Sequence, residues 1–438
     1  MSLSGHIPTS IGALDSLTEL VLKHNSLTGS LPQELCNAKH MFLIDVSWNE
    51  FEEYIPQCFE SLVELRLIVL ESNKLSGPLF NTTPLVLLNT LIVTDNKLSG
   101  SLPISQMGWS DESTLYGYFG SNSFSGRLDD ESCSAQNHIV FLDLSNNLFT
   151  GSIPSSISKI MSLEYLLLNG NKFTGDIPDA WGDFNILRQL NIGANELQGT
   201  LPALLGSLNT LSSLQLSGNY FTGPLLASLF NTDSMTAVEH IDCSDNYLSG
   251  SLPQQYNGIN ITTSLMYLNI SNNLFTGSIV STITSLNGLL FLDVSYNHLS
   301  GTIPAEMCNR ALGNMPDQLF EFIASNNLLW STLPNCMGNM SLFLLDLSFN
   351  HLTGQLDSSL GNLREVESLL LNSNFFSNQI PDVLFSSFIS NYPENQLSVI
   401  DFSDNIFSGT IPSSLFTLTS LHALSLSSNC FTGEFPSR

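Results

Sequence analysis

The chain has 438 residues and a formal net charge of −27, with 12 Lys+Arg against 39 Asp+Glu. This charge argues against binding to nucleic-acid phosphate or to an anionic membrane surface, and favours a basic or uncharged partner, although acidic residues also keep an apolar chain soluble. Hydrophobic residues make up 42% of the chain, yet no run approaches the ~20 apolar residues of a membrane-spanning helix.

Taken in chain order, the predicted elements are copies of one stretch. The copy between Leu163 and Pro178 reads L-x-x-L-x-L-x-x-N-x-F/L-x-G-x-I/L-P. The alternating L-x-L predicts a short strand with one buried face, and the Asn predicts a turn whose backbone groups its side chain satisfies. The Gly allows a positive φ, and the Pro then begins an extended segment. The repeated Asn occurs seventeen times: Asn25, Asn49, Asn73, Asn96, Asn122, Asn147, Asn171, Asn195, Asn219, Asn246, Asn273, Asn297, Asn327, Asn350, Asn374, Asn405 and Asn429.

This period is typical of a leucine-rich repeat solenoid, in which stacked coils bury their leucines as one column. We therefore expect a single domain over 1–438, with a partial first repeat at 1–16 and seventeen repeats over 17–438. The chain begins and ends inside a repeat. We expect no caps, transmembrane segment or kinase domain in it, and ends that self-associate or fray.

The lettering continues beyond the Asn as N-x-L/F-x-G-x-I/L-P, as in Asn96 to Pro103 and Asn297 to Pro304. This resembles the plant-specific leucine-rich repeats in the ectodomains of receptor-like kinases and receptor-like proteins. The resemblance implies an α/β-type repeat solenoid, a right-handed superhelix with a parallel β-sheet on the concave face and short strands, 3-10 turns or loops on the convex face. It also implies recognition of a peptide or protein ligand outside the cell, with a co-receptor as a second partner.

The sequence holds no G-x-S-x-G, H-E-x-x-H, C-x-x-C or phosphate-loop motif, so we expect no enzyme activity, metal or cofactor. We expect a non-catalytic recognition scaffold. Two rival hypotheses remain: a secreted enzyme inhibitor similar to polygalacturonase-inhibiting proteins, and a structural or ice-binding solenoid.

Two columns of residues on the concave face are candidate ligand-binding positions. Adjacent strands are about 4.8 Å apart, so residues at one offset form a contiguous row. The column six residues before the Asn is rich in rings, which either contact a ligand or merely shield the core. Its rings, with Tyr118 from the neighbouring column, are Tyr116, Tyr118, Phe141, Tyr165, His240, Tyr267 and Phe291.

The column four residues before the Asn is acidic, and Ser recurs two residues later. These side chains either bond to neighbouring strands and turns or hold calcium or a basic ligand. The acidic row consists of Asp45, Asp143, Asp242, Asp293, Asp346 and Asp401.

Cysteines and glycosylation sequons indicate an extracellular or cell-surface location. Cys36 and Cys308 lie eleven residues after a repeat Asn, and Cys58 and Cys336 lie nine after the next one, which predicts the disulfides Cys36–Cys58 and Cys308–Cys336. A glycan at Asn269 would crowd Tyr267, so the rings from Tyr116 to Tyr165 are favoured as the ligand contact. The sequons are at Asn81, Asn260, Asn269 and Asn339.

Overall fold

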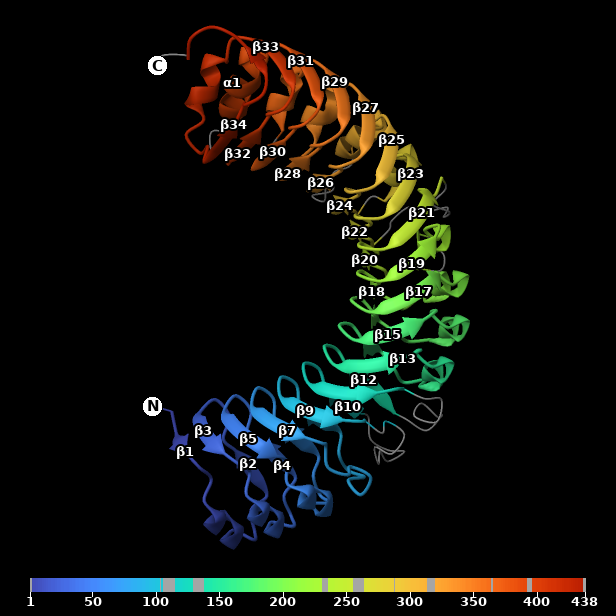
Figure 1. The fold of residues 1–438 in the computed structure, drawn as a ribbon, viewed down its shortest axis with the longest axis vertical. Coiled ribbons are helices and arrows are strands. Elements are labelled where there is room, and N and C mark those ends of the chain that lie inside the picture. Colours follow the sequence, from blue (N-terminus) through green and yellow to red (C-terminus); the bar gives the residue numbers. More distant parts are fainter. Residues whose placement is uncertain are drawn as a thin grey trace. The chain divides into compact units, whose positions relative to one another are not determined.

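The computed structural model describes residues 2–102, 104, 115–128, 138–230, 235–254, 264–286, 288–312, 320–363, 365–391 and 396–435. The chain divides into two compact units, 1–220 and 221–438. Each unit is a stack of similar coils, and each coil passes through a strand, a turn, a second strand and a return segment that is often a short 3-10 helix (Figure 1).

The first unit has two series of parallel strands. The series that carries the candidate ligand-binding positions is β2 (Glu19–Val21), β4 (Leu43–Asp45), β6 (Leu67–Val69), β8 (Thr90–Ile92), β10 (Leu115–Tyr118), β12 (Ile139–Asp143), β14 (Tyr165–Leu167), β16 (Gln189–Asn191) and β18 (Ser213–Gln215). The second series is β1 (Ser4–Gly5), β3 (Ser26–Gly29), β5 (Glu50–Tyr54), β7 (Lys74–Gly77), β9 (Lys97–Gly100), β11 (Ser123–Gly126), β13 (Leu148–Gly151), β15 (Lys172–Gly175) and β17 (Glu196–Thr200). The 3-10 helices are η1 (Thr9–Ala13), η2 (Gln33–Asn37), η3 (Gln57–Ser61), η5 (Ser155–Lys159), η6 (Asp179–Asp183) and η7 (Ala203–Ser207).

The second unit repeats this plan, and β19 (Tyr220–Gly223) lies at the boundary. Its first series is β20 (His240–Asp242), β22 (Tyr267–Asn269), β24 (Phe291–Asp293), β26 (Glu321–Ile323), β28 (Leu344–Asp346), β30 (Ser368–Leu370), β32 (Val399–Asp401) and β34 (Ala423–Ser425). Its second series is β21 (Tyr247–Ser251), β23 (Leu274–Ser278), β25 (His298–Gly301), β27 (Leu328–Ser331), β29 (His351–Gly354), β31 (Phe375–Asn378), β33 (Ile406–Gly409) and β35 (Cys430–Phe431). Its helices are η8 (Ala227–Phe230), η9 (Ser281–Ser285), η10 (Ala305–Leu312), η11 (Asn335–Asn339), η12 (Ser358–Asn362), η13 (Ser413–Thr417) and the α-helix α1 (Asp382–Asn391).

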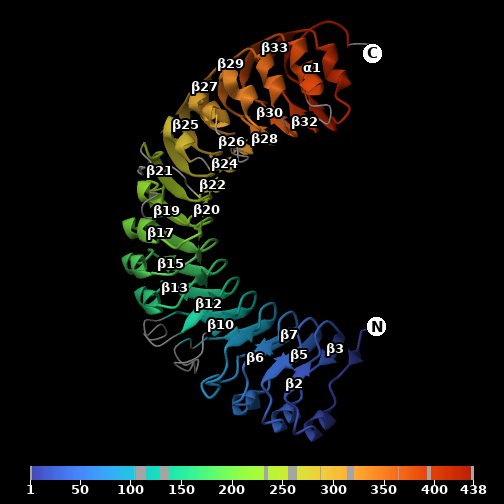
Figure 2. The same ribbon diagram turned by 180° about the vertical axis from the view of Figure 1, so that it is seen from behind.

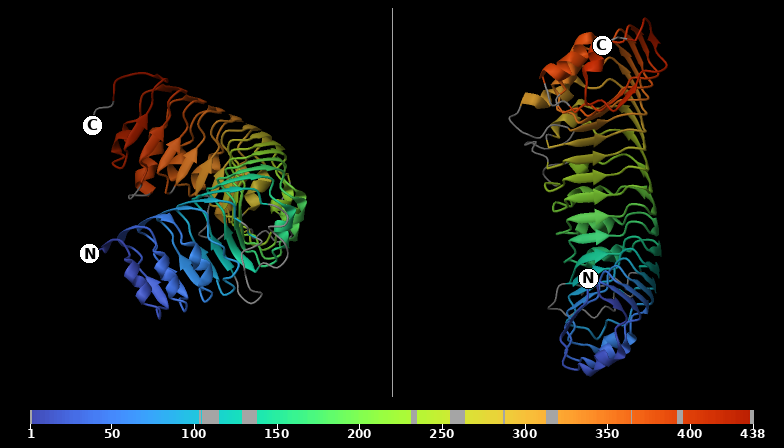
Figure 3. Two further views of the ribbon diagram at one scale, coloured as in Figure 1. Left: turned by 60° about the horizontal axis from the view of Figure 1, so that its bottom comes forward. Right: turned by 90° about the vertical axis from the view of Figure 1, so that its left-hand side faces the viewer.

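Neighbouring coils pair in parallel with a shift of one repeat. Tyr165 pairs with Gln189 and Leu166 with Leu190. In the three-residue strands of the first series from β2 to β32, the middle residue is buried in the core, so its neighbours on either side point to the opposite face. Within each unit the 3-10 helices lie away from these strands (Figures 1 and 2), and Figure 3 shows the coils of each unit stacked strand upon strand. The predicted fold class, a leucine-rich repeat solenoid with parallel sheets, is confirmed.

The repeated Asn holds consecutive coils together. Asn171 donates from Nδ2 to the carbonyl oxygens of Leu144 (2.9 Å), Leu168 (3.0 Å) and Asn169 (3.3 Å). Its Oδ1 accepts from the backbone N–H of Phe149 in the preceding coil at 3.1 Å. One buried amide therefore satisfies four backbone groups that the turn would otherwise leave unpaired.

A second core row lies two residues after the Asn. It is a leucine in some coils and a phenylalanine in others, and its members from Leu27 to Phe407 are almost completely buried. Phe149 and Phe173 stack in this row with ring centroids 6.1 Å apart and planes 2° apart.

The α-helix α1 is a departure from the expected 3-10 turns and loops. It lies in the long interval between Asn374 and Asn405, where the extra residues give room for more than two helical turns. Leu384, Phe385 and Phe388 are buried along it, and this spacing forms one apolar face.

Candidate functional site

The first aromatic patch consists of Tyr116, Tyr118, Phe141 and Tyr165, on β10, β12 and β14. Tyr118 stacks on Phe141 with centroids 4.4 Å apart, and Phe141 contacts Tyr165 at 5.3 Å. Tyr116 is 38% exposed, and the other three are half-buried. Burial raises the pKa of the Tyr118 phenol, and the charges of Tyr116 and Asp143 add to this rise. The rings of Tyr118, Phe141 and Tyr165 therefore form a continuous aromatic surface across three strands.

Tyr118 belongs to this patch because its ring contacts Phe141, although Phe141 is not its register partner in the sheet. Tyr116 pairs with Phe141 along the sheet, and Tyr118 pairs with Asp143. The ring stacked on Phe141 is nevertheless that of Tyr118, which reaches diagonally across the strands as a long side chain can.

The second aromatic patch consists of His240, Tyr267 and Phe291, on β20, β22 and β24. These residues occupy one register position, and their rings stack almost parallel. The centroids of His240 and Tyr267 are 4.0 Å apart, and those of Tyr267 and Phe291 are 4.3 Å apart. Burial lowers the pKa of His240, which favours a neutral imidazole in this stack. All three side chains are half-buried.

The acidic row is built into local turns. In Asp293, Oδ1 accepts from the backbone N–H of Ser295 at 2.8 Å and from its hydroxyl at 2.6 Å. Burial is the largest influence on the pKa of Asp293 and raises it, while the Ser295 hydrogen bonds lower it. Comparable side-chain pairs with the Ser two residues later occur at Asp45, Asp242, Asp346 and Asp401.

The other acidic residues of the row vary this arrangement. Asp143 accepts from the Ser145 N–H at 2.8 Å, and burial again raises its pKa most strongly. Asp45 also forms an ion pair with Lys23, with 3.6 Å between Nζ and Oδ2. These contacts are those expected if the acidic side chains bond to neighbouring turns. Among the described residues, no group of His, Cys, Asp or Glu side chains could hold a metal ion.

Two sets of surface residues escaped the sequence analysis. Phe320 and Phe343 stack with centroids 4.9 Å apart, seven residues before Asn327 and Asn350. The second set directly flanks the repeated Asn in the second unit, and its members are 41–59% exposed. Reading the columns on either side of the Asn would have found it: Tyr247, Leu274, Tyr296, Leu328, Phe349, Phe375 and Ile406.

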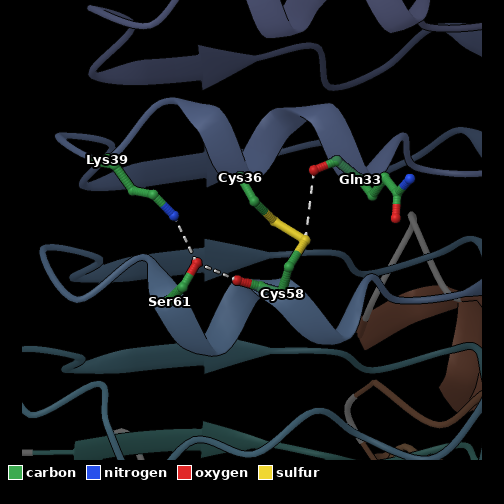
Figure 4. The surroundings of a disulfide bond; sticks show 5 residues. All are labelled: Gln33, Cys36, Lys39, Cys58 and Ser61. Atoms are coloured by element: carbon green, nitrogen blue, oxygen red, sulfur yellow. Dashed lines mark hydrogen bonds between the residues drawn. A yellow bond between two sulfur atoms is a disulfide. The ribbon is translucent and has the colours of Figure 1, made fainter.

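Two disulfides join successive coils on the helix side. Cys36 of η2 is bonded to Cys58 of η3, with Cα atoms 6.0 Å apart. Figure 4 shows Ser61 beside this bond, accepting from Lys39 Nζ at 2.9 Å and donating to the Cys58 carbonyl at 2.7 Å.

The other described cysteines form a second disulfide or are free. Cys308 of η10 is bonded to Cys336 of η11, with Cα atoms 5.7 Å apart. Cys243 and Cys430 are free, the first buried and the second exposed. Burial raises the pKa of the Cys243 thiol, which suits its role as a small apolar side chain.

The sequons differ in accessibility. Asn81 and Asn339 are exposed. Asn269 is half-buried within the second aromatic patch, where its Nδ2 lies 3.4 Å from the Tyr267 hydroxyl. Asn260 lies outside the described residues.

Comparison with known proteins places the repeats in a family. The Leucine Rich Repeat family model matches residues 16–38, 138–160, 162–184, 264–286, 288–309, 341–363 and 396–418. Receptor-like protein 34 of Arabidopsis thaliana is 30% identical over 181 residues, which cover 38% of this chain and 19% of that protein. Receptor-like protein 39 of the same plant is 36% identical over 103 residues, 23% of this chain and 11% of that protein. The matched region thus spans about a fifth or less of these relatives.

Solved structures agree with this assignment. The ectodomain of the Arabidopsis receptor kinase GASSHO1/SCHENGEN3, in complex with CASPARIAN STRIP INTEGRITY FACTOR 2, has a TM-score of 0.85 at 32% identity, covering 99% of this chain and 50% of that one. HAESA, in complex with the peptide hormone IDA and the co-receptor SERK1, has a TM-score of 0.77 at 29% identity, covering 99% and 74%. Within the described part of our chain, no helix has the length and apolar character needed to cross a membrane. Seven segments of the chain thus match leucine-rich repeats, and the chain resembles the ectodomains of plant receptor-like proteins and receptor kinases.

Proposed function

We propose that this chain is a non-catalytic recognition module, located outside the cell or at its surface, that binds a peptide or protein ligand on the face carrying the first strand series. The observation that carries the proposal is the first aromatic patch. Its rings contact one another across three neighbouring strands, and they remain partly open to solvent although the core lies on the other side of the sheet. Large rigid rings of this kind are common anchors in protein interfaces.

The similar proteins support this proposal. The GASSHO1/SCHENGEN3 ectodomain, at 32% identity, was solved in complex with CASPARIAN STRIP INTEGRITY FACTOR 2, and HAESA, at 29% identity, with the peptide hormone IDA and the co-receptor SERK1. By analogy, a peptide ligand and a co-receptor are the partners we propose here.

The test is a peptide-library selection on the purified chain, followed by alanine replacement. Phe141→Ala with Tyr165→Ala should weaken the selected ligand by at least about thirtyfold, because central aromatic anchors typically contribute ~2 kcal/mol or more. Trp330→Ala is the control: its ring is 55% exposed but lies on the second strand series. Equal affinity of the double variant and the native chain, with unchanged circular dichroism, would refute this assignment of the contact.

A further inference from the structure

The second aromatic patch ends on an acidic side chain. Tyr267 covers one face of the Phe291 ring at 4.3 Å, with 6° between the ring planes. The opposite face is turned along the sheet toward the next strand, where Glu321 occupies the register position of the ring column. Glu321 therefore places a carboxylate where the next ring of the stack would be.

More carboxylates flank this end of the stack. Asp293 lies two residues after Phe291, and Asp346 lies two strands further at the same register position. The charges of Asp346 and Asp242 raise the pKa of Asp293, and those of Asp242, Asp293 and Glu321 raise that of Tyr267. The four carboxylates occupy register positions on the same face of the sheet as the ring stack.

In the described part of the chain, none of these carboxylates forms an ion pair with a lysine or an arginine. The ion pairs found there, Lys23–Asp45, His40–Glu64, Lys74–Glu50 and Arg188–Glu164, all lie in the first unit. No lysine follows Lys172 in the sequence. The serine hydrogen bonds of Asp242, Asp293 and Asp346 are made to Oδ1, so within the described residues these bonds leave Oδ2 of each carboxylate for another donor.

We propose that the second aromatic patch, with Glu321, Asp293 and Asp346, binds the guanidinium group of an arginine side chain in a peptide ligand. The proposal deepens the proposed function and rests on it, because it takes the same strand face as the ligand surface. A guanidinium group is planar, stacks on a ring face and donates two parallel hydrogen bonds to a carboxylate. The compact ammonium group of lysine matches only the charge.

The first aromatic patch lacks this combination. Tyr165 pairs with Gln189, and Leu167 pairs with Asn191, so an amide stands where the second patch has Glu321. Asp143 is the acidic residue of the row in that patch. The two patches therefore provide a matched comparison within one chain.

The experiment measures the affinity of two capped pentapeptides by saturation-transfer NMR titration: Gly-Gly-Arg-Gly-Gly and the same peptide with citrulline, the neutral isostere of arginine. All proteins carry Asn269→Gln, which removes the sequon and any glycan beside Tyr267. The arginine peptide should bind at least about tenfold more tightly than the citrulline peptide, and its affinity should fall with rising salt.

Variants then separate this site from general attraction to an acidic protein. Phe291→Ala, and Asp293→Asn with Glu321→Gln, should each bring the two peptides to similar affinity. Glu52→Gln with Glu60→Gln removes the same charge from exposed positions of the first unit and should keep the preference for arginine, as should Phe141→Ala.

Three results would overturn the arginine site. They are equal affinity of the two peptides, undetectable binding of both, and equal loss of preference in the Glu52/Glu60 control. If library-selected ligands still lose affinity in the Phe141/Tyr165 double variant, the proposed function stands and only the arginine site falls. If substitutions in both patches leave the affinity of those ligands unchanged, the proposed function is refuted as well.

Discussion

Ser331 stands where most coils have a glycine. Gly175 occupies this position with φ 82°, while Ser331 has φ 90°. A residue with a Cβ pays roughly 1–2 kcal/mol in this left-handed region, and glycine's greater freedom in the unfolded chain offsets about 0.5–1 kcal/mol of that difference. Ser331→Gly should therefore stabilise the protein by about 0.5–1 kcal/mol in urea unfolding.

Gly175→Ala is the matched control for this change. The added Cβ would lie 3.5 Å from the Ser152 Cβ, an ordinary contact, so the φ strain acts alone. We expect a loss of similar size, about 0.5–1 kcal/mol. A destabilised Ser331→Gly protein would show that the serine is not strained.

Asp293 should make stability depend on pH in a specific direction. Its pKa is raised in the folded protein, so the folded state binds more protons than the unfolded state between the two pKa values. Stability from this residue therefore falls as pH rises through that window. Asn keeps the Oδ1 acceptor that Ser295 uses, as Asn269 does for Ser271, and it carries no charge. Asp293→Asn should therefore raise the stability relative to the native chain more at pH 7 than at pH 3, as measured by thermal unfolding.

Asp357 provides the opposite sign. Its pKa is lowered by its hydrogen bonds with Ser359, whose N–H it accepts at 2.8 Å. Its contribution is therefore present above the unfolded pKa and lost as pH falls through the folded pKa. Asp357→Asn should therefore lower the stability relative to the native chain more at pH 7 than at pH 3. The same sign for both variants would contradict these assignments.

At the scale of elements, each disulfide ties two short helices that are weak on their own. A five-residue 3-10 helix has few hydrogen bonds, and η2 and η3 have no side-chain cap. The Cys36–Cys58 bond closes a separation of 22 residues, for which the loop-entropy model gives about 3 kcal/mol. Peptide mapping of secreted protein without reduction should find Cys36–Cys58 and Cys308–Cys336 linked, and Cys36→Ser with Cys58→Ser should lower the unfolding free energy by about that amount. Free thiols at all four positions after secretion would contradict this.

The sequence predicted those elements that depend on periodic positions. The strands and the Asn turns recur because every coil presents the same backbone groups to the next one, and the Asn side chain satisfies them. The positive φ after the turn recurs because Gly adopts it at a low conformational cost. The contacts between surface rings were less predictable. Tyr118 rather than Tyr116 stacks on Phe141. The repeat does not predict this contact, because it depends on the side-chain rotamers and on contact between diagonal positions of neighbouring strands. The helix α1 (Asp382–Asn391) was also missed, since the repeat does not specify what an insertion does.

At the scale of the whole molecule, the basic residues are unevenly distributed along the sequence, whereas the net charge is not. The ion pairs of the described residues lie in the first unit, and after Lys172 the basic residues other than histidine are Arg188, Arg310, Arg364 and Arg438. With a net charge of −27, self-repulsion opposes the folded state. That repulsion should be less compensated in residues 221–438 than in residues 1–220.

Salt should therefore act differently on the two units. Raising NaCl from about 20 mM to about 300 mM shortens the screening length from roughly 20 Å to about 6 Å. In residues 221–438 this mainly weakens repulsion between carboxylates, so amide hydrogen exchange should slow. In residues 1–220 it also weakens attractions such as Lys74–Glu50, whose Nζ and Oε2 are 3.0 Å apart, so exchange should change less. Repeating the experiment at a pH where most carboxylates are protonated is the control, because the difference should then vanish. Equal slowing in both units at neutral pH would show that net charge, rather than its distribution, governs the response.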